Sequence, residues 1–162
     1  METITFFDLC WNDQVQGRVV FKLFKDIPRS RLFYIMCSGR RGISYKDCDS
    51  LEVHNYGTAQ ALISGGVCTA AAVDTFEDLI HDDSGLETHF STPGLLTVST
   101  DEDSKHRMNF YVNIRSQKSP YMKNVIGEVI SGLDILRAAA RYEPNSENRS
   151  VSINDCGIII HF

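Results

Sequence analysis

Short runs of β-branched and aromatic residues, each ended by glycine, proline or polar residues, recur along this chain and constrain its fold most strongly. They predict strands at residues 4–10, 18–25, 51–56, 59–63, 95–99, 109–114, 125–130 and 151–160. The polar break Trp11-Asn12-Asp13-Gln14 between the first two runs predicts an antiparallel pair. So many short strands leave many edges to cover, and we therefore expect a mainly β protein with an antiparallel sheet.

Two segments have a helical rather than a strand-like pattern. Pro28 suits the first turn of a helix, where its missing N–H costs nothing, and Gly39 stands where that helix would stop. Residues 133–141 favour a helix by propensity and end shortly before Pro144. We expect a closed eight-stranded antiparallel β-barrel capped by these two α-helices, because closure hides strand edges. Periodicity alone does not separate a barrel from a sandwich.

Length and charge limit the function classes. The 162 residues suit a single domain over 1–162, and the formal charge of −5 argues against nucleic acid as a partner. No apolar run reaches the roughly 18 residues of a membrane-spanning helix, and the N-terminal residues do not resemble a secretion signal. Residues 47–104 contain 12 acidic side chains and no Lys or Arg. This acidic middle is either a solvated surface or a contact for a basic partner.

The five cysteines predict free thiols rather than a disulfide framework. Their number is odd and no two have the C-x-x-C spacing. We therefore expect a reducing compartment and an intracellular protein, cytoplasmic or nuclear. His81-Asp82-Asp83 with His89 is the best metal candidate, but it lies in a loop-like stretch without a helical frame, so neither a metal nor another cofactor is expected.

Several short motifs, in order and at similar spacing over about residues 4–158, resemble the cyclophilin pattern. They are GRVVFKLF at 17–24, CSGRRG at 37–42, TPGLLTV at 92–98, NFYV at 109–112 and INDCG at 153–157. The resemblance implies the cyclophilin fold. It also implies isomerisation of peptide bonds before proline, which face a barrier of about 18–20 kcal/mol. In that family an arginine donates hydrogen bonds around the prolyl imide and an apolar pocket holds the proline ring.

The positions that the family uses for catalysis have changed here. Counting back from Gly65, the arginine position falls on Tyr56, or on Asn55 with one insertion, and no arginine occurs between Arg41 and Arg107. By resemblance, the peptide-groove positions are Tyr56, Ala61, Leu62, Ser64, Ser99, Tyr111, Lys118, Ser119 and Lys123. Only Tyr111 keeps the character of its position. We expect no catalytic residues and a non-catalytic domain for protein–protein interaction or scaffolding, the alternative being a weak or active prolyl isomerase.

The partner surface is predicted from the loop that follows residue 100. A charged sequence replaces the small, glycine-containing loop of the family, and the candidate contacts are Asp101, Glu102, Asp103, Lys105, His106 and Arg107. Arg107 also borders the family's groove, where it could supply a guanidinium from a new direction. We expect a protein partner that presents a Pro-containing or a basic segment, no membrane, and no tight binding of cyclosporin, the family's groove ligand.

Overall fold

The computed structural model describes residues 3–25, 27–68, 86–88, 92–98, 108–115, 122–142 and 150–160. Its strands are β1 (Thr3–Trp11), β2 (Gln14–Leu23), β3 (Glu52–His54), β4 (Leu62–Gly65), β5 (Leu86–Thr88), β6 (Leu95–Val98), β7 (Phe110–Asn113), β8 (Met122–Ser131) and β9 (Ser152–Ile160). Its helices are α1 (Pro28–Ser38), the 3₁₀ turn η1 (Tyr45–Asp47) and α3 (Leu133–Tyr142). The mainly β prediction is confirmed.

The β1–β2 hairpin extends further than its sequence predicts. Asn12 and Asp13 both have positive φ, 56° and 58°, as a tight two-residue hairpin turn requires. Pairing therefore runs as far as Trp11 opposite Gln14, and the irregularity between Leu9 and Cys10 absorbs one extra residue of β2. The polar residues before Gly17 thus belong to the strand, because the turn is shorter than the polar break.

All the described strands join one antiparallel sheet in the order β3-β4-β7-β6-β8-β2-β1-β9, with β5 also paired to β8. The expected closed barrel is wrong: the described strands form an open half-barrel. β3 has only three residues and pairs with β4 alone, so it forms no ladder with β9 among the described strands. The two ends of the sheet meet instead through one backbone hydrogen bond, from the Leu51 N–H to the Val151 carbonyl oxygen (2.9 Å).

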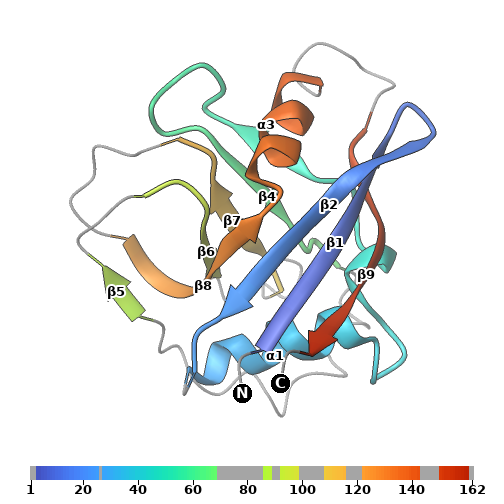
Figure 1. Ribbon diagram of the computed structural model, residues 1–162, viewed down its shortest axis with the longest axis vertical. Helices are drawn as coiled ribbons and strands as arrows, with labels where there is room; N and C mark the ends of the chain where they lie inside the picture. Colours follow the sequence, from blue (N-terminus) through green and yellow to red (C-terminus); the bar gives the residue numbers. More distant parts are fainter. Residues whose placement is uncertain are drawn as a thin grey trace.

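The two predicted helices are confirmed and lie at opposite ends of the curled sheet (Figure 1). α1 begins with Pro28 and ends at Gly39, whose φ of 68° is left-handed and whose N–H bonds the Ile35 carbonyl oxygen. Before α3, the Gly132 carbonyl accepts N–H groups from the helix's first turn. No helix within the described ranges is long and apolar enough to cross a membrane.

Aromatic side chains occupy the centre of the core. Phe7, Phe21, Phe33, Tyr45 and Phe110 are all at most 2% exposed and contribute from β1, β2, α1, η1 and β7. Their rings contact one another at centroid distances of 5.0–5.8 Å, mostly tilted or edge-on. This cluster joins the hairpin, α1 and the strands that carry the candidate site.

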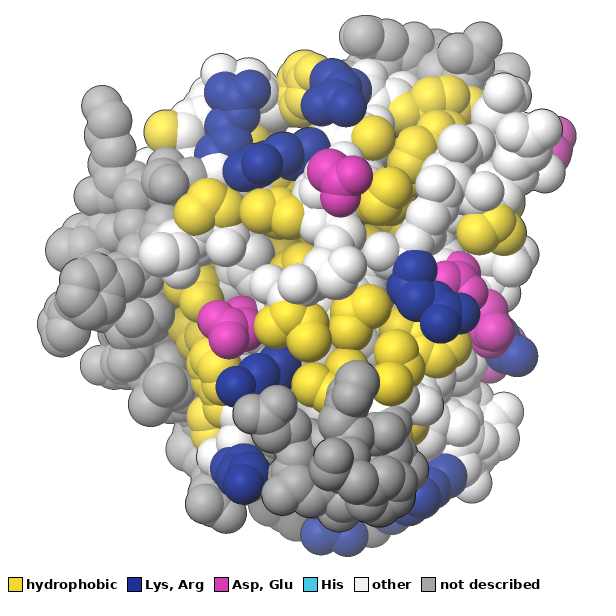
Figure 2. Space-filling model, in the orientation of Figure 1, with side chains coloured by type: hydrophobic (Ala, Val, Ile, Leu, Met, Phe, Trp, Pro, Cys, Tyr) yellow, Lys and Arg dark blue, Asp and Glu magenta, His cyan; other side chains and the backbone are white. Residues whose placement is uncertain are grey.

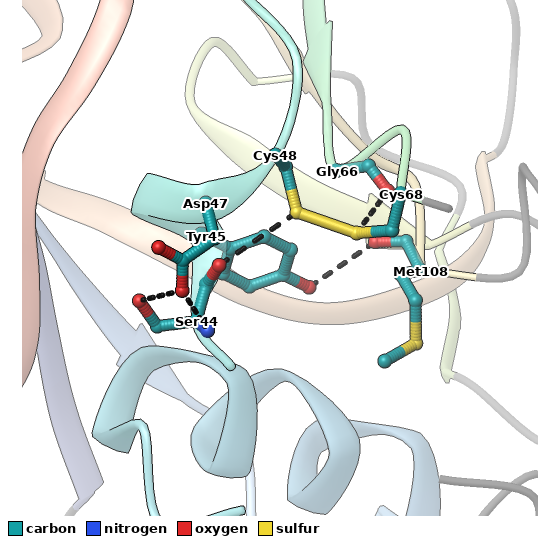
Figure 3. Close-up of a disulfide and its surroundings, with 7 residues drawn as sticks. All are labelled: Ser44, Tyr45, Asp47, Cys48, Gly66, Cys68 and Met108. Atoms are coloured by element: carbon teal, nitrogen blue, oxygen red, sulfur yellow. Dashed lines mark hydrogen bonds between the residues drawn. A yellow bond between two sulfur atoms is a disulfide. The ribbon is translucent and has the colours of Figure 1, made fainter. Parts of the chain in front are cut away.

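The cysteine prediction is wrong for two residues, because Cys48 and Cys68 form a disulfide (Figure 3). The bond links the end of η1 to the segment that follows β4, across a Cα–Cα distance of 5.1 Å. Their separation of 20 residues carries no sequence signal of pairing, and only the fold brings them together. Cys10, Cys37 and Cys156 are free. The expectation of an intracellular protein rested on five free thiols, so it loses part of its basis and stays a prediction.

Candidate functional site

The outer face of β3, β4, β7 and β6 carries three of the positions that the resemblance assigns to the peptide groove, Leu62, Ser64 and Tyr111. Strand register places Glu52 opposite Ser64, Ser64 opposite Tyr111, and Tyr111 opposite Thr97, so these four side chains share one face. The alternate residues on the same strands are core residues, among them Ile63, 1% exposed. The structure therefore brings Ser64 and Tyr111 together as neighbours, while their role in a peptide groove stays a prediction.

His54 is the residue that sequence reasoning missed. It lies on the same face, opposite Leu62, and its Nε2 is 2.8 Å from Ser64 Oγ, a hydrogen bond whose direction follows the imidazole tautomer. Glu52 Oε2 is 3.8 Å from the same Nε2. The His54 side chain is 41% exposed, so solvent reaches it. Knowing how β3 pairs with β4 would have identified His54. Counting residues back from Gly65 could not, because it points to Tyr56 or Asn55.

Both residues proposed for the arginine position lie beyond the end of β3. Asn55 has a φ of 56°, and its carbonyl oxygen accepts hydrogen bonds from the Thr58 N–H (3.1 Å) and hydroxyl (2.7 Å). Tyr56 follows in this turn and is 47% exposed. We expected residues 51–56 and 59–63 to form strands, but the turn takes residues from both. β3 is therefore shorter and β4 starts later than predicted. On the strand itself, Glu52 and His54 point to the face where Ser64 lies.

Ala61 belongs to a different environment from the groove face. It is 1% exposed, and its carbonyl oxygen accepts the Ile114 N–H (3.1 Å). With Tyr56 it lines a separate cavity beside α3. Two of the positions assigned to the groove by resemblance therefore meet away from Ser64, while Leu62 stays on the groove face.

Asn113 holds one border of the site. It is fully buried, and its Oδ1 accepts the Leu95 N–H (2.8 Å) while its Nδ2 donates to the Thr92 carbonyl oxygen (2.7 Å). These bonds fix the turn before β6 against β7. Because both ends of the amide are engaged inside the fold, Asn113 supports the face rather than offering a ligand contact.

The remaining predicted positions fall mostly outside the part of the chain that is described. Lys123 lies in β8. Ser99, Lys118 and Ser119 lie outside the described residues, as do the candidate partner contacts Asp101, Glu102, Asp103, Lys105, His106 and Arg107. The metal candidate around His81 also lies outside them, and no cluster of metal-binding side chains occurs among the described residues.

The free thiols Cys37 and Cys156 line one hollow beside the end of α1. Burial, with a smaller contribution from the charge on Cys156, raises the pKa of the Cys37 thiol well above its usual value of 9.0. The thiolate is the reactive form of cysteine, so this shift keeps Cys37 protonated and a weak nucleophile at neutral pH.

Comparison with known proteins agrees with this architecture. The family model described as cyclophilin type peptidyl-prolyl cis-trans isomerase/CLD matches residues 6–158. A protein named peptidyl-prolyl cis-trans isomerase from Encephalitozoon cuniculi (strain GB-M1) is 24% identical over 95% of this chain and 93% of its own length. The proteins named E3 SUMO-protein ligase RanBP2 from Pan troglodytes and Homo sapiens are each 24% identical over 96% of the chain.

The chain spans only 5% of the length of those two RanBP2 relatives. Among solved structures, the crystal structure of the mimivirus cyclophilin superposes with a TM-score of 0.71 at 21% identity, over 99% of this chain and 90% of that one. The likeness shows the same fold. With the matched family model spanning nearly the whole sequence, this chain belongs to the cyclophilin-type peptidyl-prolyl cis-trans isomerase family.

Proposed function

We propose that this chain is a non-catalytic cyclophilin-like domain that acts as a protein–protein interaction module. The observation that carries the proposal is the side chain that β3 presents beside Ser64, which is His54 and not an arginine. The sequence has no arginine between Arg41 and Arg107, so no change of alignment supplies one to this strand.

The chemistry of the family explains why this substitution matters. Hydrogen-bond donors that are already positioned for the transition state assist the twisting of the bond before proline. Removing one such donor typically raises the activation free energy by about 2.7–4 kcal/mol. A guanidinium offers five N–H donors, whereas an imidazole offers at most two. One ring nitrogen of His54 is already engaged with Ser64. We therefore expect a loss of roughly a hundredfold or more in the rate of isomerisation.

A protease-coupled assay on an Ala-Pro peptide tests the proposal. We expect turnover at least a hundredfold below that of an ordinary cyclophilin, and turnover within tenfold of it would overturn the proposal. His54→Arg restores a guanidinium on the same face and is expected to raise the rate. Glu52→Arg places the same group two residues away and is the matched control, expected to raise it less.

A weak prolyl isomerase is the second candidate function. The Encephalitozoon cuniculi relative that carries the isomerase name matches this chain over nearly its full length, which favours retained activity. His54 also lies where a donor could reach a bound peptide. A measurable rate that disappears in His54→Ala but survives in Glu52→Ala would support this alternative.

The partner is proposed to be a protein with a Pro-containing or basic segment, inside the cell. Similarity to a short part of the two RanBP2 relatives supports a role as one module among others. The contact region is proposed to be the charged residues 101–107 with the acidic middle of the chain, since such charges steer and discriminate partners. Changing Asp101, Glu102 and Asp103 together to Lys should reduce co-purification of the native partner, with folding checked by thermal melt. Unchanged yield and salt dependence would exclude this surface.

A further inference from the structure

A second cavity, away from the groove face, lies between α3 and the segment that follows β7. Three arginines line it, Arg115 after β7 and Arg137 and Arg141 on α3. Its apolar lining comes from Ala61, Ile114 and Ala140. We call this cavity the arginine pocket. Its volume of about 210 Å³ suits one or two side chains rather than a whole small molecule.

The three arginines concentrate positive charge at one end of the molecule. In Figure 2, Lys and Arg side chains, with an acidic side chain beside them, gather around hydrophobic atoms at the end where Figure 1 places α3. All three arginines are exposed, and none has a carboxylate partner among the described residues. Asp134, one turn before Arg137, is exposed and forms no ion pair with it. Arg137 and Arg141 are four residues apart, a spacing at which like charges destabilise a helix, so an anion between them would relieve repulsion.

The pocket is partly organised before any ligand arrives. Arg137, which lines the pocket, donates from Nε to the Ile114 carbonyl oxygen (3.0 Å), and this bond holds its guanidinium beside the segment that follows β7. Ala140 and Ala61 are each 1% exposed, and their small side chains leave the space that a longer side chain would fill. Tyr56, which also lines the pocket, has 47% of its surface exposed and offers an aromatic contact.

We propose that the arginine pocket binds a short acidic segment of a protein partner, with carboxylates on the arginines and an aliphatic side chain over the alanines. Guanidinium groups match the planar geometry of carboxylates and can bind them through two parallel hydrogen bonds. The apolar lining would be contacted by an aliphatic side chain next to the carboxylates, and an inorganic anion has no such side chain. This inference goes beyond the proposed function, because it concerns a different surface and does not depend on whether the groove face is catalytic.

The net charge favours a short peptide over a nucleic acid. The whole chain carries −5, which repels a long polyanion. A short acidic segment is attracted by the nearby arginines, while charges further away are screened beyond about 8 Å at physiological ionic strength.

The test uses the peptide acetyl-Glu-Glu-Leu-Glu-Glu-amide and the whole chain, with calorimetry for affinity and amide chemical shifts for location. We expect saturable binding that weakens as salt is added, with shifts at Ile114 and Ala140 and not at Ser64 or Tyr111. The double variant Arg115→Glu/Arg141→Glu should weaken binding at least tenfold, and Arg137 is kept because its bond supports the fold. A peptide with Gln in place of each Glu should also bind at least tenfold more weakly.

The matched control is Arg31→Glu/Lys46→Glu, which makes the same change in charge at two exposed positions on α1 and η1. It should alter affinity less than twofold. The proposal is overturned by an absence of saturable binding, by equal affinity for the wild type and Arg115→Glu/Arg141→Glu, or by tighter binding of a single-stranded oligonucleotide than of the peptide. The prolyl isomerase assay tests the groove face, whereas the peptide titration tests the arginine pocket. Either the proposed function or this inference can therefore fail without the other.

Discussion

Tyr45→Phe is the perturbation whose effect can be worked out most completely. Tyr45 is 2% exposed, and its ring contacts Phe7, Phe33 and Phe110 at centroid distances of 5.6, 5.1 and 5.1 Å. Its hydroxyl donates to the Met108 carbonyl oxygen at 3.2 Å, as Figure 3 shows. Phenylalanine keeps the ring contacts and leaves that buried carbonyl without this donor. We expect the free energy of unfolding to fall by about 1–3 kcal/mol at pH 8.

The same substitution should change the response to alkaline pH. Burial, with smaller contributions from the charges of Cys37 and Cys156, raises the pKa of Tyr45 well above its usual value of 10.0. The hydroxyl therefore ionises first in the unfolded chain, so stability that is complete below pH 10 declines as the pH rises toward the folded pKa. At pH 11 the ionised unfolded chain is favoured by about 1.4 kcal/mol, the value of RT ln 11. Tyr45→Phe does not lose this amount, so its deficit against the wild type should shrink by about 1.4 kcal/mol between pH 8 and pH 11.

Urea unfolding followed by circular dichroism at the two pH values measures both effects. Cys37, whose pKa is also raised by burial, is present in both proteins, so its contribution cancels in the comparison. Tyr34→Phe, which removes a hydroxyl from a half-buried ring, is the control at pH 8 and should change stability by no more than about 0.5 kcal/mol. The reasoning is refuted if Tyr45→Phe costs nothing at pH 8, or if its deficit is the same at pH 11.

Three further predictions concern the disulfide, one turn and the groove. Changing Cys48 and Cys68 together to Ser should lower the free energy of unfolding by about 3 kcal/mol, since the bond spans 20 residues; an unchanged Tm under non-reducing conditions would contradict this. Gly66→Ala should destabilise by more than about 1 kcal/mol in urea unfolding, because φ is +86° and the added Cβ would collide with the Met108 carbonyl oxygen; wild-type stability would show that this turn relaxes. Cyclosporin should show no tight binding in calorimetry, because no arginine occurs between Arg41 and Arg107 to make the family's contact with this ligand; nanomolar affinity would refute this.

The sequence by itself determined both α-helices and the order of the described strands other than β5, but it did not predict β5 or η1. β-branched and aromatic runs located the hairpin and the strand that ends the described chain, because alternation of burial along a strand is a local property. Pro28 and Gly39 marked α1 because each restricts the backbone of its own residue. The order of short motifs also indicated the family, which the comparisons confirm.

Tertiary structure decided which residues meet. Counting along the chain placed the arginine position on Tyr56 or Asn55, whereas the register of β3 against β4 presents His54 to Ser64. A shift of one residue moves every side chain of a strand to its other face, and turn length, which sets the register, is poorly encoded in composition.

The disulfide, the open half-barrel and the arginine pocket depend on the fold in the same way. Cys48 and Cys68 are separated by 20 residues, and Arg115 joins Arg137 and Arg141 at one cavity only because the fold brings α3 beside the segment that follows β7. Local preferences act over a few residues, while these contacts join segments whose approach is set by the burial of one shared core. The sequence therefore determines the elements by local physics, and the tertiary structure determines the sites because they are made from residues that meet only after folding.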